Sequence, residues 1–228
     1  MDEKIVITVD GPAGSGKSTI SRLLADHYAY TYLDTGALYR AMAFRLWDAG
    51  FKEVGPQALD LCRRMKLTLK RDNGSLRVWM DGEDLSDKIR TEEIGLYASR
   101  ISAIPLVRQI LLSVQREIGA GGGVVAEGRD MGTVVFPGAE VKFFLDASVE
   151  KRAERRYLEL IGKGVPAKQK DVEEDLITRD RQDRERSVSP LLVPAKAVVI
   201  DTSEKTIPQV VDIMRGVIDK TLSLKGTG

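Results

Sequence analysis

A short glycine-rich stretch near the start of the chain constrains its fold more than any other feature. The stretch reads VDGPAGSGKSTIS over residues 9–21, and from Gly11 to Ser18 it fits the pattern G-x-x-x-x-G-K-[ST]. Glycine allows positive φ and a close approach to a ligand, and the backbone N–H groups of such a loop surround an anion. The flanking residues fit this role, because Ile5–Val9 is typical of a buried parallel strand and Thr19–Tyr28 of an amphipathic helix.

The loop predicts a site for the phosphates of a nucleoside triphosphate. Lys17 would reach the β- and γ-phosphates, and Ser18 would be a ligand of Mg²⁺. The helix that begins near Lys17 would add its N-terminal partial positive charge. The residues predicted to bind ATP are Gly11, Pro12, Ala13, Gly14, Ser15, Gly16, Lys17, Ser18 and Thr19. The pattern does not tell what happens to the γ-phosphate.

Five apolar runs rich in β-branched residues predict an α/β fold. They are separated by helical patterns or by longer insertions, and they read IVITV, YTYLD, GVVAEG, VKFFLD and AVVID. This order predicts a P-loop NTPase fold, in which a five-stranded parallel sheet carries helices on both faces. Parallel sheets bind ligands at the carboxyl ends of their strands, so residues after the second and third runs should face the same crevice as the loop.

The long segment between the second and third runs predicts an inserted subdomain. Its middle, Leu67–Leu85, alternates apolar and polar residues around Asn73–Gly74 and turns again at Asp81–Gly82, which indicates a small antiparallel sheet. Helical patterns flank it at Gly36–Gly50, Thr91–Ser102 and Pro105–Gly119. We expect one domain over 1–228, with a core at 1–35, 119–149 and 187–228, an insertion at 36–118 and a helical lid at 150–186.

Composition excludes several classes of function. The 228 residues carry 35 Lys and Arg against 34 Asp and Glu, so the net charge of +1 provides no field for nonspecific nucleic-acid binding. The single Cys62 excludes an internal disulfide, and the single His27 excludes a His-rich metal site and a catalytic triad. The charged start MDEK runs directly into the first strand, and no apolar run is long enough to span a bilayer. We expect a cytoplasmic enzyme that binds neither nucleic acid nor membrane.

Residues 151–186 help to distinguish among the classes of nucleotide-binding protein that share such a glycine-rich loop. The guanine-reading pattern N-K-x-D and an L-S-G-G-Q-like signature are both absent, which leaves the small-molecule kinases. A kinase must hold two polyanions and exclude water from the γ-phosphate, which requires arginines on movable elements. The segment has eleven Lys or Arg and nine Asp or Glu around the break GKGVPAKQK. It is either a solvated charged hairpin or a lid, and two arginine-rich faces favour the lid: Arg152, Arg155 and Arg156, and Arg179, Asp183 and Arg186.

Together, several motifs resemble those of the bacterial cytidylate kinases, which are nucleoside monophosphate kinases. The motifs are DGPAGSGKST, LDTGALYR, DGEDLSDKIRTEEI, EGRDMGTVVFP, FFLDAS and RDRQDRERSVSPL. They run from the first strand to the last. The resemblance implies a monophosphate-binding insertion with three antiparallel strands, a short arginine lid, ATP and Mg²⁺ as donor and cofactor, and CMP or dCMP as acceptor.

The resemblance also implies roles for individual residues. Arg40 and Arg129 would hold the acceptor phosphate; Thr35, Ser99, Arg108 and Asp130 would line the cytosine pocket; Arg179, Asp183 and Arg186 would contact the ribose and nearby phosphate. Thr35 stands where some relatives have Ser, and Glu127 where some have Asp. Glu127 or Asp34 would suit the water shell of Mg²⁺, but only Ser18 is assigned to the metal.

The acceptor oxygen of a monophosphate is already an anion, so phosphoryl transfer needs no general base. Lys17, Mg²⁺ and the lid arginines would supply catalysis, with Arg152 and Arg156 as unranked candidates. Two alternatives stay open: a P-loop kinase for another acceptor, such as UMP, dephospho-coenzyme A or shikimate, and a nucleotide-dependent switch that transfers nothing. We expect a monomer.

Overall fold

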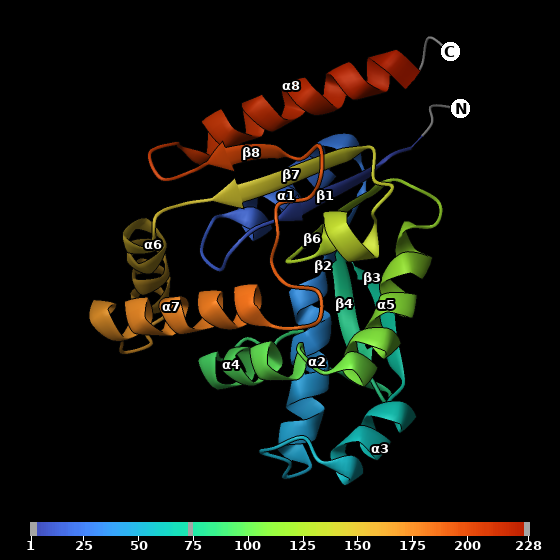
Figure 1. The fold of residues 1–228 in the computed structure, drawn as a ribbon, viewed down its shortest axis with the longest axis vertical. Coiled ribbons are helices and arrows are strands. Elements are labelled where there is room, and N and C mark those ends of the chain that lie inside the picture. Colours follow the sequence, from blue (N-terminus) through green and yellow to red (C-terminus); the bar gives the residue numbers. More distant parts are fainter. Residues whose placement is uncertain (1–3, 73–74, 226–228) are drawn as a thin grey trace.

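The computed structural model describes residues 4–72 and 75–225 and contains a five-stranded parallel sheet (Figure 1). The strand order is β2-β6-β1-β7-β8. The strands are β1 Val6–Asp10, β2 Thr31–Asp34, β6 Val124–Gly128, β7 Val141–Asp146 and β8 Val198–Asp201. All four pairings are parallel, so the five predicted runs form the predicted sheet.

Alternation along the strands divides the core between the two faces of this sheet. Val125 of β6 packs in a cluster with α1 (Lys17–Tyr28) and α8 (Ile207–Lys225), whereas its neighbours Val124 and Ala126 pack in a second cluster with helices of the insertion. Successive side chains of a strand point to opposite faces, so a run that is buried throughout needs cover on both. Every residue of β6 is buried, which confirms helices on both faces.

The predicted insertion contains the small antiparallel sheet. Its strands are β3 Leu67–Asp72, β4 Ser75–Met80 and β5 Glu83–Asp84, paired in the order β3-β4-β5. Asp81 and Gly82 both have positive φ, as expected for a tight two-residue hairpin turn. The other predicted turn, Asn73–Gly74, lies outside the described residues.

Four helices surround the small sheet, and Figure 1 shows them below the parallel sheet. They are α2 Thr35–Asp48, α3 Pro56–Arg64, α4 Glu92–Ile101 and α5 Pro105–Gly119. Side-chain caps mark the start of two of them. Asp34 accepts the Ala37 N–H at 2.9 Å at the start of α2, and Thr91 accepts the Ile94 N–H at 3.3 Å at the start of α4. Cys62 is fully buried in α3.

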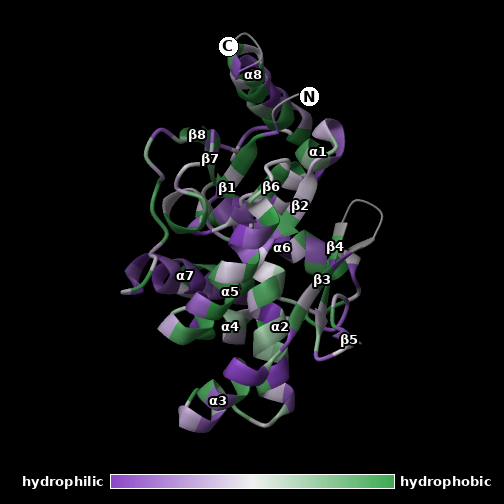
Figure 2. Ribbon diagram, turned by 90° about the vertical axis from the view of Figure 1, so that its right-hand side faces the viewer, coloured by the Kyte–Doolittle hydropathy of each residue, from purple (hydrophilic) through white to green (hydrophobic). Residues whose placement is uncertain are grey.

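The charged segment folds as two helices, α6 Val149–Gly162 and α7 Gln169–Glu185. Figure 2 shows α7 as mostly hydrophilic, and only a small apolar cluster, Ala153, Leu160, Val172 and Leu176, packs the two helices together. One element was not predicted: Met131–Val135, directly after β6, forms a single π-helical turn, η1. Within the described ranges, no helix combines the length and the apolar character needed to cross a bilayer.

The core of the insertion should govern the stability of the fold. Leu38 of α2 is fully buried, so Leu38→Ala leaves a cavity and should lower the free energy of unfolding by about 2–5 kcal/mol. Leu158 is 60% exposed on α6, and Leu158→Ala should change the free energy of unfolding by no more than about 0.5 kcal/mol. Urea denaturation followed by circular dichroism measures both. Equal effects of the two substitutions would contradict this core assignment.

Candidate active site

One cavity of about 820 Å³ lies at the carboxyl ends of the parallel strands. It brings together residues from the glycine-rich loop, the starts of α2 and η1, and helices α4 to α7. The predicted site residues that line it are Ala13, Gly14, Ser15, Gly16, Lys17, Ser18, Thr19, Thr35, Arg40, Ser99, Arg108, Arg129, Asp130, Arg156, Arg179, Asp183 and Arg186. Gly11, Pro12 and Arg152 were predicted as well but do not line it.

The glycine-rich loop has the tight geometry expected of an anion-binding loop. Gly11 has a φ of 146°, and a Cβ there would lie 2.0 Å from the carbonyl oxygen of Leu145, so no other residue fits. Gly16 has a φ of 91° and directly precedes α1. Lys17 Nζ donates to the carbonyl oxygen of Pro12 at 2.5 Å. Burial, and next the positive charge of Arg129, lower the pKa of Lys17, which an anion bound beside it would oppose.

Two carboxylates meet beside the loop because of strand register. Asp34 of β2 and Glu127 of β6 are paired residues, so their side chains leave the sheet on the same face. Glu127 Oε2 accepts the Ser18 hydroxyl at 2.9 Å, and Oε1 accepts the hydroxyl of Tyr32. Burial raises the pKa of Glu127, and the charge of Asp34 raises it further. Among the described residues, no three His, Cys, Asp or Glu side chains form a metal site by themselves.

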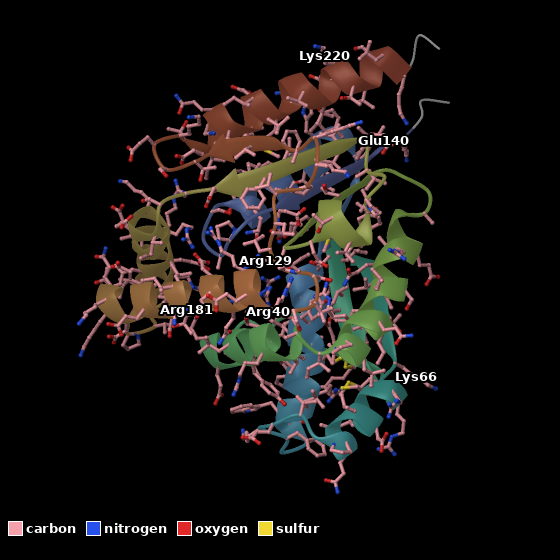
Figure 3. All side chains as sticks on the ribbon, viewed as in Figure 1. Arg40, Lys66, Arg129, Glu140, Arg181 and Lys220 are labelled. Carbon is pink, nitrogen blue, oxygen red and sulfur yellow. The ribbon has the colours of Figure 1, made fainter. Side chains whose placement is uncertain are left out.

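Ion pairs hold the arginines on the opposite side of the cavity. Arg129 Nε donates to Asp183 at 2.7 Å, and Arg108 donates to Asp130 and to the carbonyl oxygen of Ser102. Both carboxylates are buried. Figure 3 shows Arg129 just below the parallel sheet and Arg40 of α2 beneath it, beside the end of α7. Arg108 and Arg129 are therefore held by buried carboxylates while they line the cavity.

The α7 arginines reach across to the insertion. Arg179 lies over Gly95 of α4, where an added Cβ would come within 3.7 Å of its guanidinium. Burial lowers the pKa of Arg179 to about 10, and Arg129 adds to this effect, so the side chain stays charged at neutral pH. Arg186 donates to Ser102 Oγ at 3.0 Å, and Ser99 donates to Gln182 at 3.1 Å.

The charge of the cavity favours an anionic ligand. Eleven Lys or Arg and seven Asp or Glu line it, whereas the whole chain carries a net charge of only +1. The positive charge is thus concentrated at this one place. A glycine-rich anion loop on one side and paired arginines on the other suit a ligand pair in which both members are phosphorylated.

Comparison with known proteins identifies the family. Residues 7–220 match the family described as "Cytidylate kinase". The chain belongs to the cytidylate kinase family. A cytidylate kinase of Citrifermentans bemidjiense is 48% identical over 220 residues, which cover 96% of this chain and 94% of that protein. One from Geobacter sp. strain M21 is 46% identical over the same shares of both chains.

A solved structure of low sequence identity shares the fold. A gluconokinase of Sinorhizobium meliloti 1021 superposes with a TM-score of 0.50 at 14% identity, over 100% of this chain and 99% of that one. This likeness shows the fold alone. It agrees with the P-loop kinase architecture predicted for this cytidylate kinase family member.

The three arginines predicted on one face of α6 have different partners. Arg152 is 2% exposed, and its three nitrogens donate to Ala147 O at 2.9 Å, Ala13 O at 3.1 Å and Asp180 at 2.7 Å. Arg156 lines the cavity and donates to Glu92 of α4. The structure therefore separates two candidates that the sequence left unranked: Arg156 faces the cavity, and Arg152 ties α6 to α7 and to the loop.

One wall of the cavity was not predicted from the sequence. This wall follows β8 and consists of Thr202, Lys205, Thr206, Ile207 and Val210. Arg155 donates to Thr202 Oγ1 at 3.1 Å, and Thr202 Oγ1 donates to the Ser15 carbonyl at 3.1 Å. The carboxyl end of the predicted strand AVVID was the available signal, because ligands of parallel sheets bind at such ends. Tyr39, Arg90 and Glu92 were missed too, although they lie within motifs that the analysis quoted.

The Arg152–Asp180 pair should contribute to stability. Asp180→Ala leaves the buried guanidinium of Arg152 without its carboxylate, so the free energy of unfolding should fall by about 3–5 kcal/mol. Glu174, an exposed residue of the same helix, faces Lys170 at 3.7 Å, and Glu174→Ala should cost at most about 1 kcal/mol. Chemical denaturation at pH 7 tests this. A loss below 1 kcal/mol for Asp180→Ala would show that Arg152 is not a structural residue.

Proposed function

We propose that this protein transfers the γ-phosphate of ATP to CMP or dCMP and releases ADP with CDP or dCDP. One observation carries the proposal: a single cavity joins the anion-binding loop to a second set of arginines, so two phosphorylated molecules fit with their phosphates facing each other. Membership of the cytidylate kinase family specifies the acceptor. It favours CMP over UMP, dephospho-coenzyme A and shikimate, and a transferase over a nucleotide-dependent switch.

The roles proposed for the site residues are those that the resemblance to the cytidylate kinases implies, and the cavity supports them by bringing most of these residues together. The loop residues from Gly11 to Thr19 are proposed to hold the phosphates of ATP, and all of them except Gly11 and Pro12 line the cavity. Arg40 and Arg129, which also line it, are proposed to hold the phosphate of CMP. The residues proposed to bind the cytosine are Thr35, Ser99, Arg108 and Asp130. Those proposed to bind the ribose and nearby phosphate are Arg179, Asp183 and Arg186. Residues 36–118 then form the monophosphate-binding insertion, and residues 150–186 form the lid.

The reaction needs no proton acceptor, because the attacking oxygen of CMP is already ionised. The protein supplies in-line positioning and compensation of negative charge. Lys17 is proposed to leave the Pro12 carbonyl and donate to the transferring phosphoryl group, and Arg156 to leave Glu92 for the same region. Both side chains already line the cavity, so these changes require only side-chain rotation.

The residues beside the loop fit a Mg²⁺ ion. Mg²⁺ prefers oxygen ligands and binds through one or two protein groups together with substrate phosphates and water. The Ser18 hydroxyl is such a group, and the carboxylates of Glu127 and Asp34 stand close enough to accept from the ion's water molecules. When bound, Mg²⁺ would neutralise charge on the phosphate oxygens of ATP. Ser18 is the proposed direct ligand.

The protein is proposed to act as a monomer in the cytoplasm. The anion-binding loop and the second set of arginines, the two parts that the proposed reaction needs, both lie within the described part of this chain. The single cysteine, Cys62, is buried and unpaired, as is usual for proteins of a reducing compartment.

A panel of nucleoside monophosphates tests the proposed function. ADP release is measured by a coupled assay with ATP, Mg²⁺ and CMP, dCMP, UMP, AMP or GMP, and CMP and dCMP should give the highest kcat/KM. No release above the rate with ATP alone, for any acceptor, would contradict a kinase. Faster turnover of UMP than of CMP would contradict the acceptor.

Lys17→Ala should lower kcat by at least about 10²-fold, because it removes a cation that compensates charge in the transition state. The fold should persist, because the hydrogen bonds of Lys17 Nζ, to the Pro12 carbonyl and the Ser15 hydroxyl, lie within the loop itself. Lys220 on α8 is exposed and remote from the cavity (Figure 3), so Lys220→Ala serves as the control with unchanged kcat. Steady-state kinetics and circular dichroism provide the readouts. Normal turnover in Lys17→Ala would remove the loop from catalysis.

Asp130→Asn should weaken discrimination between bases. A carboxylate accepts from the N4 amino group of cytosine but repels O4 of uracil, so CMP should be favoured over UMP by about 10²- to 10⁴-fold in kcat/KM. The amide of Asn can donate to O4, so the ratio should fall by about tenfold or more.

Asp175 is an exposed carboxylate of α7 that lines the cavity, and Asp175→Asn should leave the CMP:UMP ratio unchanged. A different role for Asp130 would be to orient Arg129, but Arg129 pairs with Asp183, and Asp130 accepts from Arg108. If Asp130→Asn slows both substrates equally, Asp130 does not read the base.

A further inference from the structure

A buried carboxylate that the mechanism above does not use lies directly before the glycine-rich loop. Asp10, the last residue of β1, is fully buried, and its two oxygens have different partners. Oδ1 accepts the backbone N–H of Met131 at 2.7 Å, and Oδ2 accepts that of Gly132 at 2.8 Å. These residues are more than 120 positions away in the sequence.

The two N–H groups belong to the first turn of η1, where they would otherwise have no partner. The first N–H groups of any helix lack intrahelical acceptors. Farther along η1, the amides of Val134 and Val135 donate to the Asp130 carbonyl at 2.9 and 3.1 Å. Asp130 does not cap η1 with its own side chain. Asp10 therefore supplies from a neighbouring strand the cap that the local sequence lacks.

Asp10 also holds the other end of the same short segment. Its backbone is the register partner of Gly128 in the parallel pairing of β1 with β6. Arg129 and Asp130 lie between Gly128 and Met131, so one residue anchors the chain immediately before and immediately after them. Asp130 has φ −145° and ψ 25°, outside the regular helix and strand regions, so its conformation depends on these anchors.

We propose that Asp10 is a positioning residue for the acceptor: its carboxylate fixes the Met131 and Gly132 amides and so presents Arg129 and Asp130 to the monophosphate. This rests on the proposed function, in which Arg129 holds the acceptor phosphate and Asp130 contacts the base. Because Gly11 follows Asp10 directly, the same residue connects the donor loop to the acceptor site.

The protonation chemistry of Asp10 fits a functional rather than a stabilising role. Burial raises its pKa from 3.8 to about 6, although the two backbone N–H groups lower it. A carboxyl whose pKa is higher in the folded protein makes the fold less stable as the pH rises from the unfolded pKa to the folded pKa, and the loss is complete above the folded pKa. At neutral pH the ionised Asp10 thus carries a stability cost, which a neutral side chain would avoid.

Asp10→Asn separates positioning from stability. The Asn oxygen can accept one of the two N–H groups, but its NH₂ faces the other donor to donor. The KM for the acceptor should rise about 10- to 100-fold, as expected for a misplaced binding group, and the KM for ATP should stay within about threefold. The melting temperature should fall by no more than about 4 °C. The acceptor used is CMP, or whichever monophosphate the wild-type protein phosphorylates fastest.

Thr8 provides a matched control. It lies two residues earlier on the same strand and the same face of the sheet, and its hydroxyl is buried with no hydrogen-bond partner among the described residues. Thr8→Val keeps the shape of the side chain, so the KM for the acceptor should not change. If Thr8→Val raises that KM as much as Asp10→Asn does, the effect is packing and the proposal is wrong.

Amide hydrogen exchange provides a readout that needs no substrate. In the wild-type protein the Met131 and Gly132 amides should exchange as slowly as those of strand β6, and in Asp10→Asn at least one should exchange about tenfold faster. Exchange in the wild type as fast as in an exposed loop would overturn the proposal even if Asp10→Asn does not fold. An unchanged acceptor KM in Asp10→Asn, or a parallel rise in the KM for ATP, would overturn it as well.

Discussion

The active site depends on the parallel pairing of β1 with β6 and of β6 with β2. The pairing brings the carboxyl ends of three strands to one edge, with Asp10 beside Gly128 and Asp34 beside Glu127. A segment that contributes to the site follows each of these strands. These segments are the glycine-rich loop after β1, helix α2 after β2 and the Arg129–Asp130 segment after β6. Neighbouring strands lie about 4.8 Å apart, so the three segments necessarily border the same space.

Gathering arginines around this space carries an electrostatic cost, which buried carboxylates offset. Arg108 is paired with Asp130, and Arg129 with Asp183. A buried guanidinium without a partner would be strongly destabilising, whereas a paired one is tolerated and retains further N–H groups for a ligand. The carboxylates proposed to contact the base and the ribose therefore also offset the charge of the arginines that line the cavity.

The helices α6 and α7 are joined to the rest of the protein mainly through polar contacts around the cavity. Arg156 pairs with Glu92, Ser99 with Gln182, and Arg186 with Ser102, all between these helices or their ends and the insertion. The apolar cluster of the two helices is small and separate from the two clusters of the sheet. Polar contacts can be exchanged for contacts with phosphate at little cost, which supports the proposed movement of α6 and α7 as a lid.

The sequence by itself determined the elements whose signals are local. The five strands and the small antiparallel sheet follow from strand alternation and helical periodicity, and the anion loop follows from the spacing from Gly11 to Ser18. The order of the strands along the chain indicated which segments would share a cavity. Only the tertiary structure determines which group each charged side chain has as its partner. Asp10 binds amides more than 120 residues away, and Arg152 turns to Asp180 instead of the cavity. Such partners are set by how helices pack on the sheet, and sequence spacing within one element contains no information about a partner in another.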